Sequence, residues 1–159
     1  MRPKGNARKG DTTGMEPAVL SVEELTRLLS AEFPEAFHEG SGLAIEAVWH
    51  SGCRMRQRFE AKALRPGGTI SGPTMMFLAD VAAYVGLLAS IGWVPLAVTT
   101  QLGIHFLRKP KPADLLAECR ILKLGQRLAV CEIAIRSDGE DAVVAHATST
   151  YSIPKRAVS

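Results

Sequence analysis

Hydrophobic residues recur along the chain with two different periods, and the changes between them predict the order of the elements. Apolar residues in 21–32 lie three and four positions apart, which is the spacing of an amphipathic helix. Ser21 and Glu24 stand at the positions of a capping box, so this helix is expected to start after Ser21. Residues 43–49 are a strand candidate. Residues 53–59 alternate strictly, which predicts a strand with three arginines on its solvated face.

Residues 73–91 differ from the rest because they are apolar on every side of a helix. The polar residues among them are Thr74, Asp80, Tyr84 and Ser90. Pro73 stands in the first turn, where helices tolerate proline. Such a helix lies inside a protein core or spans a membrane. Its length is marginal for spanning, a central carboxylate is costly in lipid and no basic flank lies close, so we expect a buried central helix.

After residue 97 the period becomes two and remains so. The four predicted strands lie in 97–109, 114–125, 126–137 and 142–153. Strands joined by short turns are expected to pair as antiparallel neighbours. The prediction is an α+β fold, in which an antiparallel sheet of about five or six strands wraps around one long central helix and a short N-terminal helix precedes them.

Length and charge suggest where the domain begins and ends. A chain of 159 residues with 47% hydrophobic residues is expected to form one domain. Residues 15–154 carry 13 basic and 15 acidic side chains, so nucleic acid is not an expected partner. We expect a disordered basic tail over 1–17, a single domain over 18–154 and a C-terminal tail over 155–159.

The sequence disfavours secretion, a disulfide framework, a phosphate loop and a metal site. The start of the chain lacks the apolar stretch of a secretory signal, and the three cysteines show no disulfide or zinc spacing, so a cytoplasmic location is expected. Residues 67–74 approach a phosphate loop, but Pro73 replaces its lysine. The scattered histidines have no metal-ligand spacing, and therefore no metal is expected; they are His38, His50, His105 and His146.

Asp80 is the candidate catalytic residue because it is the single carboxylate on the apolar helix. A buried carboxylate needs partners, so a purely structural role, paired with an arginine or with backbone amides, is the alternative. Gly72 stands eight residues earlier at the start of the helix, where unpaired N–H groups are found. A carboxylate that activates water or attacks, and N–H donors that stabilise an oxyanion, suit acyl transfer.

Gly72 and Asp80 of one chain cannot act on the same carbonyl group. Eight helical residues separate them by about 12 Å along the axis, whereas each must come within about 3 Å of the reacting group. An antiparallel pair of these helices would bring Gly72 of one copy beside Asp80 of the other. We therefore expect a homodimer with two equivalent sites, with a dimer of dimers left open.

Residues 40–154 resemble the hot-dog-fold acyl-CoA thioesterases of the phenylacetate-pathway (PaaI-like) type. The segments that carry the resemblance are RPGGTISGPTMMFLADVAAY, the strand ending IHFLRKP, and AHATSTYSIP. The family motif is His-Gly-Gly with an Asp seven residues after the second Gly; here Ser71-Gly72-Pro73 precedes Asp80 at that spacing. The resemblance implies that the Gly72 N–H polarises the thioester carbonyl and that Asp80 of the partner subunit is base or nucleophile. It implies that Thr99 orients the water or Asp80.

Two positions depart from the family pattern. Ser71 replaces the usual histidine, and Arg65 stands where some members carry asparagine. Ser71 can still cap the helix or donate one hydrogen bond. Arg65 either keeps Asp80 ionised or binds the ligand.

The resemblance also implies positions along the outer strands for the coenzyme A part of the substrate. They are Phe106, Lys123, Gly125, Gln126, Arg127 and Ser152. Cations beside a glycine turn suit phosphate but are also common on solvated hairpins. The same two interpretations apply to Arg108, Lys109 and Lys111. Residues 75–77 are expected in the core, with the lining of an acyl tunnel as the alternative.

The sequence therefore predicts a homodimeric hydrolase that converts a small aromatic or medium-chain acyl-CoA to free acid and coenzyme A. It needs no cofactor beyond the coenzyme in its substrate, and no membrane partner is expected. A non-catalytic acyl-CoA binding or sensing protein is the alternative. Hydratases that share the fold are disfavoured because residues 65–80 contain no histidine.

Overall fold

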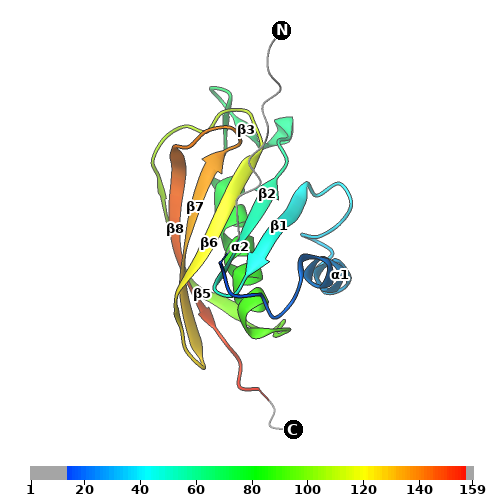
Figure 1. Cartoon of the computed structure of the whole chain (residues 1–159). Helices are drawn as coiled ribbons and strands as arrows, with labels where there is room; N and C mark the ends of the chain where they lie inside the picture. The colour runs from blue at the N-terminus through cyan, green and yellow to red at the C-terminus, as the bar shows by residue number, and fades with distance from the viewer. Residues whose placement is uncertain (1–13, 157–159) are drawn as a thin grey trace.

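A six-stranded antiparallel sheet packs against the long helix α2 (Gly72–Ile91) in the computed structural model, which describes residues 14–156 (Figure 1). In their order across the sheet the strands are β1 (Leu43–Trp49), β2 (Gly52–Gln57), β6 (Leu115–Leu124), β7 (Leu128–Ser137), β8 (Val143–Ser152) and β5 (Val98–Phe106). Helix α1 (Val22–Glu32) lies beside β1. The predicted α+β fold, with a short helix preceding a long central one, is confirmed.

The N-terminal ends of both helices are capped as their sequences predict. At α1, the Ser21 side chain accepts a hydrogen bond from the Glu24 backbone N–H at 3.1 Å, and the Glu24 carboxylate accepts from the Ser21 N–H at 2.8 Å. At α2, the Ser71 side chain accepts from the Thr74 N–H at 3.4 Å. These bonds satisfy N–H groups that the first helical turn cannot pair, and they determine where each helix begins.

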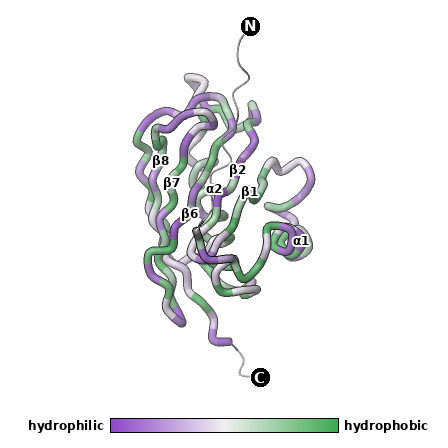
Figure 2. Tube along the Cα trace, in the orientation of Figure 1, coloured by the Kyte–Doolittle hydropathy of each residue, from purple (hydrophilic) through white to green (hydrophobic). Residues whose placement is uncertain are grey.

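Helix α2 is long and apolar enough to cross a bilayer, yet two thirds of its most apolar stretch is buried inside the protein. The strands covering it alternate between hydrophobic and hydrophilic residues, as Figure 2 shows along β6, β7 and β8. Their inward residues form the core together with α2. The expectation of a central core helix therefore agrees with the structure for most of α2, whereas the side with Met76 and Phe77 is exposed in the single chain.

Short turns predict some of the strand pairs but not the place of β5. The pairs β1/β2, β6/β7 and β7/β8 are antiparallel neighbours, as expected. β5 does not pair with β6, the strand that follows it; it pairs with β8, and β6 pairs with β2. Residues 107–114 carry the chain past β8 and β7 to the position of β6. Among the described residues, β5 is consequently an edge strand with one side unpaired.

The chain between β2 and α2 contains elements that the sequence pattern did not predict. The 3-10 helix η1 (Ala61–Ala63) leads into a small hairpin of β3 (Leu64–Arg65) and β4 (Thr69–Ile70). Gly67 and Gly68 form its turn with φ of 98° and 74°, which favour glycine. The hairpin ends next to Ser71 and so leads directly into the start of α2.

The arginine row of β2 is less solvated than expected at its centre. Arg56 forms ion pairs with Glu46, with Asp114 at 3.0 Å and with Asp138 at 2.8 Å. These carboxylates come from β1, from the start of β6 and from the turn after β7. Arg56 therefore ties three parts of the sheet together.

Most of the predicted tails fall outside the structure. Residues 1–13 and 157–159 are not among the described residues, so the expectations for them stay predictions. The Glu16 carbonyl accepts a hydrogen bond from the His50 N–H at 2.9 Å. The chain is thus attached to the domain from at least this residue onward.

Candidate active site

The Asp80 carboxylate is held by two hydroxyl groups that come from neighbouring strands. The Thr99 hydroxyl donates to Asp80 Oδ1 at 2.6 Å. The Tyr151 hydroxyl lies 3.2 Å from the same oxygen and 3.1 Å from the backbone carbonyl of Asp80. Thr99 in β5 and Tyr151 in β8 are paired in the sheet register, which places both beneath α2. The structure thus brings the predicted pair Asp80 and Thr99 together and adds Tyr151, which the sequence analysis did not include.

The second carboxylate oxygen of Asp80 is open. Among the described residues, Oδ2 accepts no hydrogen bond and no ion pair involves Asp80. Every buried side-chain oxygen and nitrogen among the described residues has a hydrogen-bond partner. Since Oδ2 has none, it is not buried. The alternative of an arginine-paired Asp80 is therefore wrong within the described chain, and Arg65 does not pair with it there. Asp80 has one anchored oxygen and one accessible oxygen.

Burial keeps Tyr151 in its protonated form. Its side chain is 4% exposed, and burial raises its pKa well above the usual value. A hydrogen bond with Thr99 works in the opposite direction, and the nearby charge of Asp80 adds to the increase. A neutral phenol is a hydrogen-bond donor, so Tyr151 can stabilise the carboxylate but is not available as a base at neutral pH.

Gly72 is the first residue of α2, and its N–H has no partner within the helix. A Cβ atom at this position would lie 3.1 Å from Cζ of Phe106, so glycine is what allows the aromatic ring to approach. Ser71 caps the helix, and its hydroxyl is 2.8 Å from that of Thr74. The predicted capping role of Ser71 is therefore confirmed.

A basic cavity of about 450 Å³ lies beside this helix start. Its lining includes Gly72, Arg65 and Phe106, together with Arg108 and Lys109 from the loop that follows β5. None of its lining residues is acidic, and no ion pair involves these three cations in the described chain. The structure thus gathers predicted site residues from two separate segments around the Gly72 amide.

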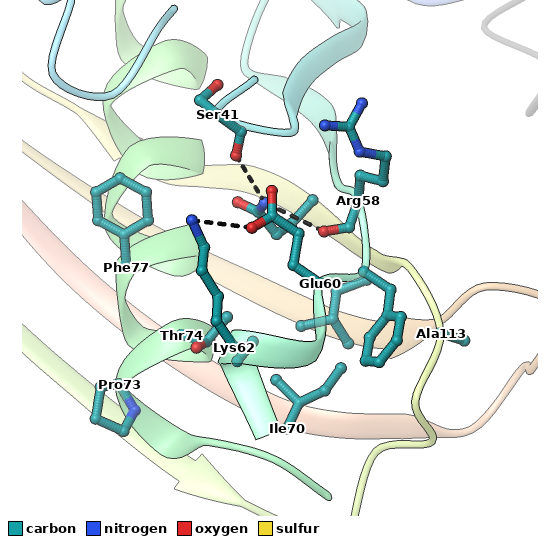
Figure 3. A pocket seen from close by; sticks show the side chains of 13 residues that line it. Ser41, Arg58, Glu60, Lys62, Ile70, Pro73, Thr74, Phe77 and Ala113 are labelled. Carbon is teal, nitrogen blue, oxygen red and sulfur yellow. Dashed lines mark hydrogen bonds and ion pairs between the residues drawn. The ribbon is translucent and has the colours of Figure 1, made fainter. Parts of the chain in front are cut away.

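A second cavity of about 440 Å³ lies on the other side of the same helical turn (Figure 3). It shares Ile70 and Pro73 with the basic cavity. Its apolar lining includes Phe59, Phe77 and Leu115, and a Glu60–Lys62 ion pair of 2.9 Å lies at its polar end. The two cavities therefore flank the first turn of α2. One carries three cations without an ion pair in the described chain, and the other joins an apolar part to a Glu60–Lys62 ion pair.

The expectation that residues 75–77 all lie in the core is wrong for two of them. Met75 is buried, but Met76 is 39% exposed and Phe77 is 45% exposed. These two residues lie on the same side of α2 as Pro73 and Asp80, which are also incompletely buried. Helix α2 therefore has one apolar face that the sheet does not cover.

The remaining predicted coenzyme contacts lie elsewhere in the fold. Gly125, Gln126 and Arg127 line a cavity of about 330 Å³ that also includes Ile91, at the C-terminal end of α2. The Arg127 side chain donates to the Ile153 carbonyl at 3.0 Å. Lys123 and Ser152 are not among the residues that line this cavity. A single chain does not bring this group to the Gly72 amide.

Comparison with known proteins agrees with this architecture. Residues 67–144 match the Thioesterase superfamily model. The Saccharolobus solfataricus protein "Putative esterase SSO1253" is 30% identical over 135 residues, which span 85% of this chain and 87% of that protein. A solved structure described as "a putative thioesterase", from Silicibacter sp., is 44% identical, covers 90% of this chain and 97% of its own, and superposes with a TM-score of 0.79. The chain belongs to the thioesterase superfamily and has its hot-dog fold.

A structure of the phenylacetic acid degradation protein PaaI from Thermus thermophilus shares this fold. Its TM-score is 0.65 at 22% identity, over 76% of this chain and 99% of its own. At this identity the similarity extends to the fold alone. Membership of the thioesterase superfamily is confirmed by the family match and the two more similar relatives, and the PaaI-like type stays a prediction.

Proposed function

We propose that the protein is an acyl-CoA thioesterase that hydrolyses small aromatic or medium-chain acyl-CoA to a free acid and coenzyme A. The observation that supports this most directly is Asp80 itself, with one carboxylate oxygen anchored and the other accessible on the uncovered face of α2. Asp80 removes a proton from water as the water attacks the thioester carbonyl. The Gly72 N–H stabilises the oxyanion, and the thiolate of coenzyme A leaves and takes up the proton.

The proposed site is formed by two copies of the chain. Gly72 and Asp80 are about 12 Å apart along α2, so each must pair with the other residue from a partner subunit. The uncovered apolar face of α2 and the unpaired edge of β5 are suited to contact a second copy. Val98 on β5 is 56% exposed and Phe77 on α2 is 45% exposed, so both surfaces offer apolar side chains to a partner. Association through these surfaces would place the two α2 helices against each other.

The two cavities suggest where the acyl part and the coenzyme part of the substrate bind. The acyl group is proposed to enter the apolar part of the cavity beside Phe77, and the coenzyme arm to follow the basic cavity beside Gly72. Arg65, Arg108 and Lys109 supply charges for its phosphates there. Lys111 is not included, because it pairs with Glu140. The hairpin with Lys123 and Arg127 stays a predicted second contact for the same coenzyme.

The proposed function is tested by measuring thiol release from a panel of acyl-CoAs. We expect wild-type protein to release coenzyme A from at least one small aromatic or medium-chain member. Asp80→Asn is expected to reduce kcat by about 100-fold or more, because it removes the base and keeps the side-chain shape. Unchanged turnover in Asp80→Asn would exclude the assigned role. Binding of acyl-CoA without thiol release across the panel would instead support a sensing protein.

The coenzyme part of the proposal is tested separately with two substrates. Lys109→Ala should raise KM for the acyl-CoA several-fold and leave KM for the N-acetylcysteamine thioester of the same acid unchanged, since the latter lacks the phosphates. Lys111→Ala is the matched control, because this lysine is already neutralised by Glu140. Equal effects of the two substitutions on the acyl-CoA would argue against the basic cavity as the phosphate site.

A further inference from the structure

Two tyrosines stack beside Asp80, and their hydroxyl groups have different partners. The rings of Tyr84 and Tyr151 lie 6.1 Å apart at an interplanar angle of 15°. The Tyr84 hydroxyl donates to the Pro95 carbonyl at 2.8 Å, in the chain that follows α2. The Tyr151 hydroxyl reaches both the side chain and the backbone carbonyl of Asp80. One tyrosine is therefore linked to the carboxylate and the other is not.

The contacts of Tyr151 distinguish the two oxygens of Asp80. A free carboxylate can rotate and present either oxygen to a water molecule. Thr99 supplies one donor to Oδ1, and the Tyr151 hydroxyl lies against the same oxygen from the adjacent strand. The single proton of the Tyr151 hydroxyl is shared between the Asp80 carbonyl and Oδ1, so this hydroxyl ties the side chain of Asp80 to its own backbone. Together with the Thr99 bond it restricts rotation of the carboxylate and leaves the lone pairs of Oδ2 free.

Tyr151 is almost fully buried, and its hydroxyl contacts Asp80. Its side chain is 4% exposed and is not among the residues that line the two cavities beside the start of α2. It lines a separate cavity of about 460 Å³ together with Thr99 and Tyr84. Its one contact with the proposed machinery beside α2 is through Asp80, and a double variant with Asp80 separates this route from a direct contact.

We propose that Tyr151, together with Thr99, is a positioning residue that selects Oδ2 of Asp80 as the oxygen that takes the proton from water. This proposal rests on the proposed thioesterase function and identifies a further residue of the same site. Because an error of about 1 Å in the position of a catalytic group can cost on the order of 100-fold in rate, one lost hydroxyl at this distance is expected to have a measurable effect.

The test compares Tyr151→Phe with Tyr84→Phe on the best acyl-CoA of the panel. Both variants keep the phenyl ring and lose one hydroxyl. We expect Tyr151→Phe to reduce kcat by about 10- to 100-fold with KM within about two-fold of wild type. Tyr84→Phe, which removes a hydroxyl bonded to Pro95, is expected to keep both constants within about two-fold. Rates are normalised to folded protein, measured by circular dichroism.

A second comparison asks whether the effect passes through the carboxylate. In an Asp80→Asn background, Tyr151→Phe should cause no further loss, because there is no base left to orient. Equal kcat for Tyr151→Phe and wild type would overturn the proposal while the thioesterase function stands. So would a full additional loss in the Asp80→Asn background, since the hydroxyl would then act by another route. A wild-type protein without thioesterase activity would overturn both proposals.

Discussion

Pairing of Gly72 from one subunit with Asp80 from the other predicts that two defective variants can restore each other. The first variant is Asp80→Asn. The second is Gly72→Pro, which removes the proposed oxyanion donor. Proline is tolerated at the first helical position, and Ser71 before it has an extended ψ of 151°, which a following proline requires.

The expected losses follow from the contacts of each residue. Removal of one oxyanion donor costs about 10² to 10³ in kcat. The proline ring would also meet Phe106, because a Cβ at Gly72 lies 3.1 Å from its Cζ atom. Phe106 is 50% exposed, so its ring has room to shift. Gly72→Ala introduces the same Cβ but keeps the N–H, and it therefore measures the steric part alone.

A mixed dimer of the two variants contains one intact site and one doubly defective site. If subunits assemble at random, half of the dimers are mixed, and the mixture should reach about one quarter of wild-type activity. Co-expression with two different affinity tags allows the mixed dimer to be purified, and about half of wild-type kcat per dimer is expected. Thiol release from acyl-CoA is the assay. A purified mixed dimer no more active than its parents would refute the shared site, and so would an active monomer.

Three further predictions concern the elements that position the site. Ser71→Ala removes the cap of α2 and should lower the free energy of unfolding by about 0.5–2 kcal/mol in urea titrations; an unchanged midpoint would contradict the capping role. Gly86→Val should destabilise the core by about 1–3 kcal/mol in the same titration, because a Cβ at Gly86 lies 2.9 Å from Cys119 Sγ in the packed interior. Hydrogen bonds from Arg120 and, to a smaller extent, from His146 hold the pKa of Glu132 below its usual value. The stability that these bonds contribute is therefore fully present above the pKa of Glu132 in the unfolded chain, and it is lost as the pH falls through its lower pKa in the folded protein. As the pH is lowered below about 5, the melting temperature of Arg120→Ala should therefore decrease less than that of wild type. Parallel curves of melting temperature against pH would contradict this.

Local signals in the sequence were sufficient to predict the helices and three of the strand pairs. The capping box at Ser21 and the cap at Ser71 act over three residues, and short turns join β6, β7 and β8. The place of β5 could not be predicted in this way. Its pairing with β8 joins residues about 50 positions apart, and the alternation within β5 is equally consistent with either edge of the sheet.

Tyr151 could not be assigned to the site from local sequence signals for the same reason. Alternation in the last strand placed it on the same face as Ala145 and Ala147, and both of these are buried. A buried phenol needs a hydrogen-bond partner, which was a signal that could have been used. Its partner is 71 positions away, and only the register of β8 with β5 and the packing of α2 on both strands bring it to Asp80.

The sequence by itself determined that a lone carboxylate would lie on an apolar central helix, a fixed number of residues after a capped start. The spacing depends on the helical rise per residue, and the significance of the carboxylate depends on the cost of burying a charge. Both can be judged from a short stretch of sequence. Only the tertiary structure decided which oxygen of that carboxylate stays accessible, which cations gather beside Gly72 and which face of α2 is left uncovered. These depend on side chains distant in the sequence that packing brings within a few ångströms of one another.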